Sequence, residues 1–440
     1  MNAPENVTTQ KKGLPYWRDY PEQDTEIVRL YPPTYKPITP EEIWTKEKMT
    51  LYCHIPFCQC VCYSCPFRKI RPTEEKVENY CAAMTKEIRY YARQPYVQDH
   101  ELVVVYLGGG TPTTLATDQL SELITLIFNS FNFDKNYEFT LESTPQDLTA
   151  EKAKMAFDSG VNRISIGVQS FNDDELKHMG RGHNVQDAEK SIEIARNAGF
   201  ESVGIDILYG LPGQTLESWK KTVQRAIDLK LVNINFIHFV WIKNNANIIR
   251  NIRNQVPYQS PREERKEMFF RAVDMLQKKG YNGYHMDEFS LPGFESARVQ
   301  RNFGEALDEI GVGSSAMAYM KNTWYVNEAD VSKYIERINQ GELPPVVYGH
   351  KLSKEDQMRR ALVIGMKAAR VSRKKFKDRY GVDLADLYQD AINQLAEQGL
   401  IKLTDEAIEM CLPKGAYYSD NICKAFYDKK YKYIPQLWQW

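Results

Sequence analysis

Five of the eight cysteines in this 440-residue chain lie within thirteen residues, 53–65, which read CHIPFCQCVCYSC. Disulfides, a zinc site, an iron–sulfur cluster and chance are the four explanations for such a density. Disulfides belong to oxidising compartments, and the N-terminal stretch MNAPENVTTQKKGLPYW lacks the apolar core of a signal peptide. We therefore expect a cytoplasmic protein whose cysteines are reduced.

Three of these cysteines, Cys58, Cys62 and Cys65, have the spacing C-x3-C-x2-C. Zinc sites use four ligands, usually as two separated pairs, but no second pair follows here and His54 is the only histidine nearby. A [4Fe–4S] cluster also takes four ligands, so three thiolates would leave one iron open to a substrate or cofactor. A zinc-binding module remains the alternative at this point.

The elements that must position this loop follow a regular alternation. Short apolar runs predict buried strands, and amphipathic stretches of 10 to 16 residues between them predict helices. Strands are predicted at 101–107, 137–142, 163–168, 202–210 and 232–240. Helices are predicted at 73–94, 117–131, 149–160, 184–199 and 215–230. We expect about six β/α units between residues 50 and 290, forming a parallel sheet.

The fold class is therefore α/β, with a barrel or partial barrel favoured over a doubly wound sheet because no Gly-rich dinucleotide fingerprint follows the first predicted strand. In parallel α/β barrels the chemistry lies at the carboxyl ends of the strands. Those ends carry GGGTPTTL at 108–115, then Glu142, Gln169 and Asp206. Four consecutive polar or Gly-rich strand ends indicate a ligand site on one rim.

C-x3-C-x2-C followed by a GGG strand end resembles the radical S-adenosylmethionine (SAM) superfamily. The detail YCHIPFCQCVCYSC, together with GGGTP, IGVQSFN and DILYGLPGQT, is similar to its oxygen-independent coproporphyrinogen dehydrogenase branch. The match runs from about residue 52 to residue 317 and more weakly beyond. The resemblance implies a partial (β/α)6 TIM-like barrel, a [4Fe–4S] cluster, and reductive cleavage of SAM to a 5′-deoxyadenosyl radical.

The resemblance also implies roles for particular residues. Cys58, Cys62 and Cys65 match the cluster ligands, whereas Cys53 and Cys60 lie outside the spacing and are interpreted as structural. The matches to SAM-contacting positions are Tyr52, Gly109, Gly110, Thr111, Glu142, Gln169, Arg181 and Asp206. The chemistry of the residues is compatible, because a SAM carboxylate needs donors such as Arg181 and ribose hydroxyls suit the acids. No catalytic acid or base is assigned.

The second half resembles the same branch. The loop GVGSSAM at 311–317 looks like one that borders a second SAM or substrate pocket, with Phe303, Ile310, Gly313 and Ser315 as its predicted contacts. The last hundred residues resemble a small α+β winged-helix-like domain. We expect an N-terminal arm at 1–48, the barrel at 49–290, a bridging segment at 291–345 and the C-terminal domain at 346–440.

Two departures from the branch guide the predicted reaction. A cysteine that coproporphyrinogen dehydrogenases carry is Phe67 here, and RVQRNFGEA replaces the haem motif of the related chaperones. We therefore expect one or two SAM molecules and transfer of a one-carbon unit, by methylation or cyclopropanation, to an sp² carbon. Tetrapyrrole chemistry (coproporphyrinogen decarboxylation or anaerobic haem opening) and a non-catalytic haem carrier are the alternatives.

Composition limits the partners. The net charge is −1, with 42% hydrophobic and 26% charged residues, which gives no reason to expect nucleic acid or an anionic membrane. No apolar run approaches the roughly 18 residues that span a bilayer. We expect a monomer that acts on a large, planar or unsaturated small molecule and takes electrons from a donor such as flavodoxin or ferredoxin.

Overall fold

The computed structural model describes residues 48–60, 62, 65, 70–239, 260–428 and 430. Its main feature is a twelve-stranded sheet in the order β12-β11-β10-β9-β1-β2-β3-β4-β5-β6-β8-β7. The strands β1 to β6 are all parallel, which confirms the expected six units. They are β1 (Met49–Ile55), β2 (Glu101–Gly109), β3 (Asn132–Ser143), β4 (Arg163–Gln169), β5 (Ser202–Tyr209) and β6 (Asn233–His238).

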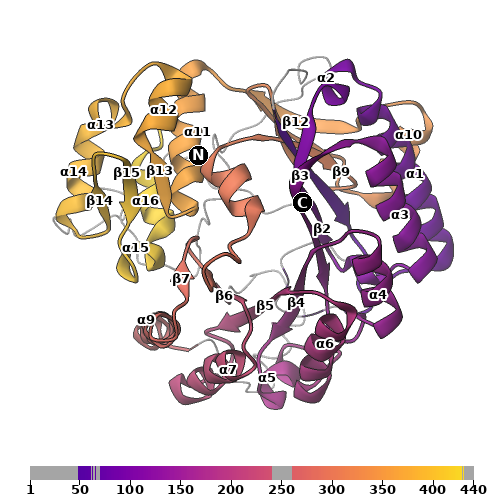
Figure 1. The fold of residues 1–440 in the computed structure, drawn as a ribbon, viewed down its shortest axis with the longest axis horizontal. Coiled ribbons are helices and arrows are strands. Elements are labelled where there is room, and N and C mark those ends of the chain that lie inside the picture. The colour runs from indigo at the N-terminus through magenta and orange to yellow at the C-terminus, as the bar shows by residue number, and fades with distance from the viewer. Residues whose placement is uncertain are drawn as a thin grey trace, which may run out of the picture.

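Helices connect these strands and cover the outside of the curved sheet (Figure 1). They begin at side-chain caps, for example where Thr73, Thr149 and Asn184 each accept a hydrogen bond from a first-turn amide. These helices are α1 (Glu74–Ala92), α2 (Pro95–Gln98), η2 (Pro112–Thr114), α3 (Thr117–Ser130), α4 (Ala150–Asp158), α5 (Asp173–His178), α6 (Val185–Ala198), α7 (Leu216–Asp228) and α9 (Arg262–Gln277).

Each parallel strand divides its side chains between two faces. In β1, Leu51, Cys53 and Ile55 join the hydrophobic core, while Tyr52 and His54 alternate with them. Because successive side chains point to opposite faces of a strand, the alternate residues face the concave side of the sheet. The helix side is therefore apolar, and the concave side is left for polar groups.

Two extensions widen the sheet without closing it into a barrel. On one side β9 pairs in parallel with β1, and β10, β11 and β12 follow antiparallel. On the other side β8 pairs antiparallel with β6, and β7 with β8. The added elements are β7 (Asn282–Gly283), β8 (Glu288–Ser290), η3 (Arg298–Gly304), β9 (Asp308–Val312), β10 (Met317–Met320), β11 (Thr323–Asn327), α10 (Val331–Asn339) and β12 (Val346–Lys351).

The C-terminal domain packs beside the open side of the sheet (Figure 1). It holds a three-stranded sheet of order β13-β15-β14. Its elements are α11 (Lys354–Lys367), β13 (Arg370–Ser372), α12 (Arg373–Tyr380), α13 (Leu384–Leu387), α14 (Gln389–Glu397), β14 (Ile401–Leu403), β15 (Ala407–Met410), α15 (Lys414–Tyr417) and α16 (Ser419–Ala425). The predicted boundary at residue 346 falls at β12, which belongs to the large sheet.

The predicted N-terminal arm lies outside the described residues except for its last position. Among the helices that the structure describes, none is both long and apolar enough to cross a membrane.

Candidate functional site

The cysteine loop leaves the carboxyl end of β1. The backbone N–H of Cys58 donates to the Ile70 carbonyl at 3.1 Å, and the N–H of Ile70 donates to Pro56 at 3.2 Å, so the loop is closed at its base. Cys58 and Cys62 are buried and Cys65 is half-buried. The three predicted ligands thus start from the rim where parallel barrels place their chemistry.

The Gly-rich end of β2 lies directly against this loop. Gly110 donates its N–H to the Ile55 carbonyl at 2.7 Å, and Thr111 donates to Phe57 at 2.8 Å. A Cβ on Gly110 would lie 2.6 Å from the Phe57 carbonyl oxygen. The Thr111 hydroxyl is 3.6 Å from the sulfur of Cys58. The glycine is therefore required because the cysteine loop passes so close to the backbone.

This packing changes what the glycine amides do. The N–H of Gly109 donates to Glu142 Oε2 at 3.1 Å, and those of Gly110 and Thr111 are bonded to the cysteine loop. All three amides are thus engaged within the protein. The predicted contact of Gly109, Gly110 and Thr111 with SAM stays a prediction. SAM would have to contact their carbonyl oxygens or the Thr111 side chain, because their amides are already bonded.

Arg181 reaches the loop from the turn after α5. Its Nη1 donates to Cys62 Sγ at 3.2 Å, and its Nη2 donates to the Gly167 carbonyl at 2.6 Å. A guanidinium at this position would donate to the sulfur of a cluster ligand and offset part of the negative charge of a cluster. Beside it, a Cβ on Gly182 would lie 2.5 Å from the sulfur of Cys60. The residues present therefore fit a cluster held by the three predicted cysteines.

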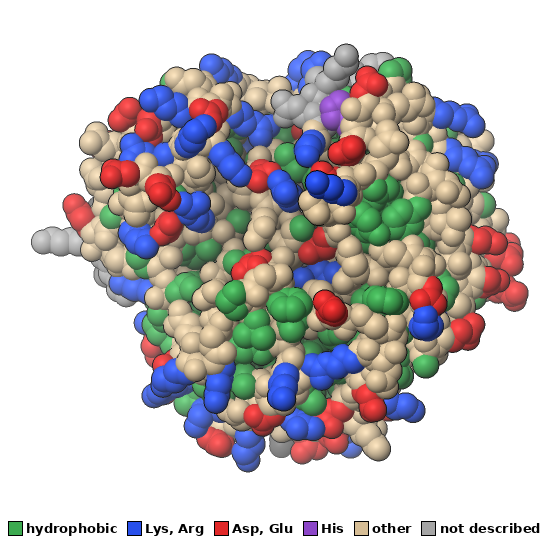
Figure 2. Space-filling model, in the orientation of Figure 1, with side chains coloured by type: hydrophobic (Ala, Val, Ile, Leu, Met, Phe, Trp, Pro, Cys, Tyr) green, Lys and Arg blue, Asp and Glu red, His purple; other side chains and the backbone are tan. Residues whose placement is uncertain are grey.

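The concave face next to the loop is aromatic and charged. Tyr52 and Tyr106 pair in register on β1 and β2, and the guanidinium carbon of Arg298 lies 5.1 Å and 4.1 Å from their ring centroids. The Tyr106 hydroxyl donates to Glu142, and Arg298 lies 3.7 Å from Glu309. The result is a cationic and aromatic platform with carboxylates at its edge; Figure 2 shows acidic and basic side chains close together near the middle of the view.

Asp206 lies next to this platform on β5. Asn235 Nδ2 donates to its Oδ1 at 3.1 Å. Burial, helped by repulsion from Glu142 and Glu288, raises the pKa of Asp206 to about 7, and burial also raises the pKa of Glu142. Asp206 thus holds or releases a proton near neutral pH. The structure brings it close to Glu142, as the strand ends predict.

Gln169 ends β4 in a left-handed conformation, with φ of 71°, which is unusual for a residue with a side chain. Its Nε2 would lie 2.9 Å from a Cβ on Gly167, so the side chain folds back over this glycine. Gln169 therefore lies on the same rim as Arg181, which bonds the same Gly167. Its predicted contact with SAM stays a prediction.

The loop predicted to border a second pocket is closed by α1. The N–H of Gly313 donates to Glu87 Oε2 at 2.9 Å, that of Ser314 to the Tyr80 hydroxyl at 2.8 Å, and that of Ser315 to the Glu328 carbonyl at 3.0 Å. All three amides are paired within the protein, as buried amides must be, and the predicted contacts of Gly313 and Ser315 with a second ligand stay a prediction.

Ile310, another residue predicted near this second pocket, adds no opening. Ile310 is fully buried in the core on β9, where it pairs in register with Leu51 of β1. The side chain of Phe303 lies outside the described residues.

Four residues of the concave face are absent from the sequence-based set: Tyr106, Arg298, Asn235 and Glu288. Tyr106 had a usable signal, since it breaks the apolar run of its strand two residues before Gly108. No sequence signal pointed to Arg298, because η3 comes next to β1 and β2 only when the chain folds back over the sheet after the barrel strands.

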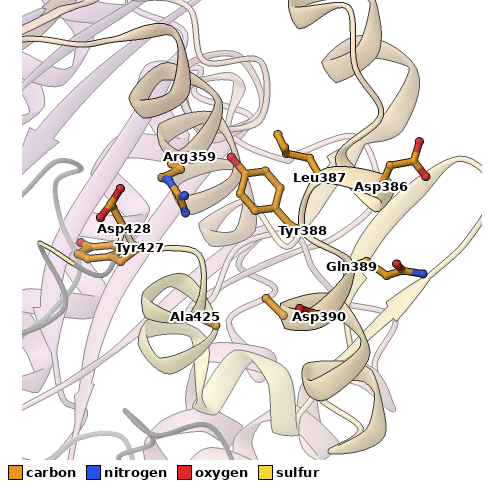
Figure 3. Close-up of a pocket in the computed structure, with 10 residues that line it drawn as sticks. Arg359, Asp386, Leu387, Tyr388, Gln389, Asp390, Ala425, Tyr427 and Asp428 are labelled. Atoms are coloured by element: carbon orange, nitrogen blue, oxygen red, sulfur yellow. The ribbon is translucent and has the colours of Figure 1, made fainter.

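A pocket of about 490 Å³ lies in the C-terminal domain (Figure 3). In it the guanidinium of Arg359 faces the ring of Tyr388 at 5.6 Å. None of the residues predicted from the sequence lines it. The lining residues are Arg359, Asp386, Leu387, Tyr388, Gln389, Asp390, Ala391, Ala425, Tyr427 and Asp428.

Comparison with known proteins identifies the family. Residues 52–226 match the radical SAM superfamily, and residues 352–410 match the HemN C-terminal domain. The chain is 32% identical to the heme chaperone HemW of Lactococcus lactis subsp. lactis (strain IL1403) over 383 residues, 85% of this chain and 96% of that protein. It is 27% identical to the oxygen-independent coproporphyrinogen III oxidase of Escherichia coli (strain K12), over 87% and 86%.

Among solved structures, coproporphyrinogen III oxidase (HemN) from Escherichia coli aligns with a TM-score of 0.76 and 25% identity, covering 87% of this chain and 90% of that one. The predicted transfer of a one-carbon unit, as a methyltransferase or cyclopropanase, is wrong, because these relatives are a heme chaperone and coproporphyrinogen oxidases. Membership of the superfamily implies a [4Fe–4S] cluster and SAM as cofactors. The chain belongs to the radical SAM superfamily, in the HemN-like branch that contains HemW and oxygen-independent coproporphyrinogen III oxidase.

Proposed function

We propose that this protein binds a tetrapyrrole on the concave face of its sheet, next to a radical SAM centre, and that haem is the first candidate. The observation that carries the proposal is the 32% identity to a heme chaperone over 96% of that protein's length. The similarity includes the barrel and the C-terminal domain, so it is not limited to the cluster motif.

The concave face supports this ligand class. The platform of Tyr52, Tyr106 and Arg298 offers flat aromatic surfaces and a cation, which suit a planar ring that carries carboxylates. Asp206 and Glu142 lie beside it as acceptors for ring N–H groups. The Nε of Arg298 is buried with no hydrogen-bond partner among the described residues, so this side chain has a donor to spare for a ligand.

When bound, the cluster supplies one electron that cleaves SAM to a 5′-deoxyadenosyl radical. This chain's own residues do the positioning. Arg181 ties Cys62 to the end of β4 through the Gly167 carbonyl, and Gly110 fixes the base of the cysteine loop. Asp206, with its pKa near 7, holds a proton beside the ligand face. Burial of these groups excludes water.

The test uses anaerobically reconstituted full-length protein. Haem titration should give a saturable Soret band at about one haem per chain, and reduction with SAM should release 5′-deoxyadenosine. Arg298→Ala should weaken haem binding at least tenfold, whereas Arg301→Ala, which removes an exposed arginine of the same helix η3 paired with Glu305, should not. Absence of haem and coproporphyrinogen binding would overturn the proposal.

Oxidative decarboxylation of coproporphyrinogen III is the second candidate. It is favoured by the structural likeness to the Escherichia coli oxidase, which covers 87% of this chain. Carbon dioxide released from coproporphyrinogen III together with 5′-deoxyadenosine would select this reaction. Saturable haem binding without carbon dioxide release would select the haem-handling function. The predicted flavodoxin or ferredoxin donor would be tested as the reductant in either assay.

A further inference from the structure

Three carboxylates, those of Asp206, Asp287 and Glu288, lie near one another at the far edge of the concave face, close enough for the other two to act electrostatically on Asp206. Asp206 is on β5, its partner Asn235 is on β6, and Glu288 pairs in register with Asn235 from β8. Asp287 precedes Glu288. Within the part of the chain that the structure describes, no lysine or arginine forms an ion pair with any of the three carboxylates. Asp287 and Glu288 are half-buried, and holding several carboxylates close together there is costly unless a proton or a cation offsets their charge.

The ligand atoms at this edge converge. His285 Nδ1 lies 2.6 Å from Asp287 Oδ1 and 4.0 Å from Glu288 Oε1, and one ligand atom of each of the three residues lies within 4.8 Å of the others. His285 is only 6% exposed. The amide oxygen of Asn235 is buried and accepts no hydrogen bond from any of the described residues. Asn235 lies opposite Glu288 in the register of β6 and β8, so its side chain is on the same face of the sheet as the Glu288 carboxylate.

We propose that His285, Asp287 and Glu288, with the amide oxygen of Asn235, bind a divalent first-row cation such as Zn²⁺ or Mn²⁺. One imidazole with several hard oxygens is a ligand set that these ions accept. The two carboxylates match the charge of a divalent ion. The Tyr284 hydroxyl donates to Glu288 Oε2 at 2.6 Å and would orient that carboxylate from outside the ligand set.

The place of the site in the fold indicates what the ion would do. Met286, between the ligands, donates its N–H to the Lys367 carbonyl at 3.0 Å, at the end of α11. The Ser419 hydroxyl lies 3.3 Å from the Met286 sulfur. The ion would therefore hold the edge of the sheet in the shape on which the C-terminal domain docks. This site is separate from the cysteine loop and does not depend on the tetrapyrrole.

Mn²⁺ is the probe, because it prefers oxygen and imidazole ligands and binds thiolates weakly. Room-temperature electron paramagnetic resonance of free Mn²⁺ counts the bound ions on the reconstituted full-length protein. We expect one saturable Mn²⁺ per chain and a rise in melting temperature with Mn²⁺. Asp287→Asn and Glu288→Gln should each weaken binding at least tenfold and remove the rise.

The matched control is Glu305→Gln, which removes a carboxylate that is already paired with Arg301 and Lys375, and it should bind Mn²⁺ as the wild type does. Each variant is compared with itself with and without Mn²⁺, because the substitutions also change contacts within the protein, of Asp287 with His285 and of Glu288 with Tyr284. The inference is overturned if the wild type binds no Mn²⁺, or if the double variant D287N/E288Q binds it equally well.

Discussion

Gly110→Ala should dislodge the cysteine loop. The added Cβ would lie 2.6 Å from the Phe57 oxygen, 2.8 Å from the Ile55 oxygen and 2.9 Å from the Pro56 carbonyl carbon. All three atoms belong to backbone, so no flexible side chain can move away to make room. The segment that moves leads directly into Cys58.

The loss of stability in Gly110→Ala has two contributions. Overpacking a tight site costs about 1–3 kcal/mol. The hydrogen bonds from Gly110 to Ile55 and from Thr111 to Phe57, at 2.7 Å and 2.8 Å, would be stretched, at about 0.5–1.5 kcal/mol each. The variant should therefore lose roughly 2–6 kcal/mol of local stability, most of it at the cluster site.

Iron and sulfide content after anaerobic reconstitution is the assay, with the melting temperature as the second measurement. We expect iron well below four per chain in Gly110→Ala. Gly304→Ala is the matched control, because its Cβ would meet nothing closer than 3.7 Å, and it should keep a full cluster. A complete cluster and an unchanged melting temperature in Gly110→Ala would refute the reasoning.

The remaining predictions concern the cysteines, Arg181 and Glu87. Replacing any cysteine of the C-x3-C-x2-C spacing with Ala should abolish iron binding, whereas Cys53→Ala and Cys60→Ala should retain it; equal iron loss in Cys60→Ala would show that the ligand set is misassigned. Arg181→Ala should lower the cluster's midpoint potential, measured by anaerobic titration, because a donor to the Cys62 sulfur is lost; an unchanged potential would count against that contact. Burial raises the pKa of Glu87 from its ordinary 4.5 to about 7, so the folded state binds the extra proton and stability falls as pH rises between these values, by up to about 3 kcal/mol. Glu87→Gln should flatten that slope in urea unfolding at pH 5 and pH 8, and a slope equal to the wild type's would contradict the assignment.

Much of the fold was accessible from local patterns. The alternation of apolar runs and capped amphipathic helices predicted β2 to β6 and the helices between them, because each signal lies within one short stretch. β1 was not predicted, although 49–55 alternates apolar residues with Thr50, Tyr52 and His54. β1 is no shorter than β4 or β6, but its place in the centre of the sheet depends on pairing with β2 and β9, which are distant in the sequence.

The rim of the site was predictable for the same reason. The carboxyl ends of parallel strands lie at one edge of the sheet. Glu142 and Asp206 were therefore expected on the same rim once the strands were recognised. The use of the glycine amides was not predictable, because it depends on how closely the cysteine loop passes Gly110. The closure of the 311–315 loop by Glu87 joins residues 226 positions apart, and no local pattern records such a contact.

The sequence by itself determined the chemistry of the centre, since three thiols at C-x3-C-x2-C are a property of eight consecutive residues. It did not determine the ligand, and the prediction of one-carbon transfer failed because it relied on single departures such as Phe67. The face that would receive a substrate is assembled from β1, β2, β3, β5 and η3. Only the tertiary structure decided that Arg298 stacks on Tyr52 and Tyr106 and that His285 joins the acids beside Asn235. Such contacts depend on strand register and on how the chain folds back after the barrel. They join residues far apart in the sequence, which local sequence patterns do not encode.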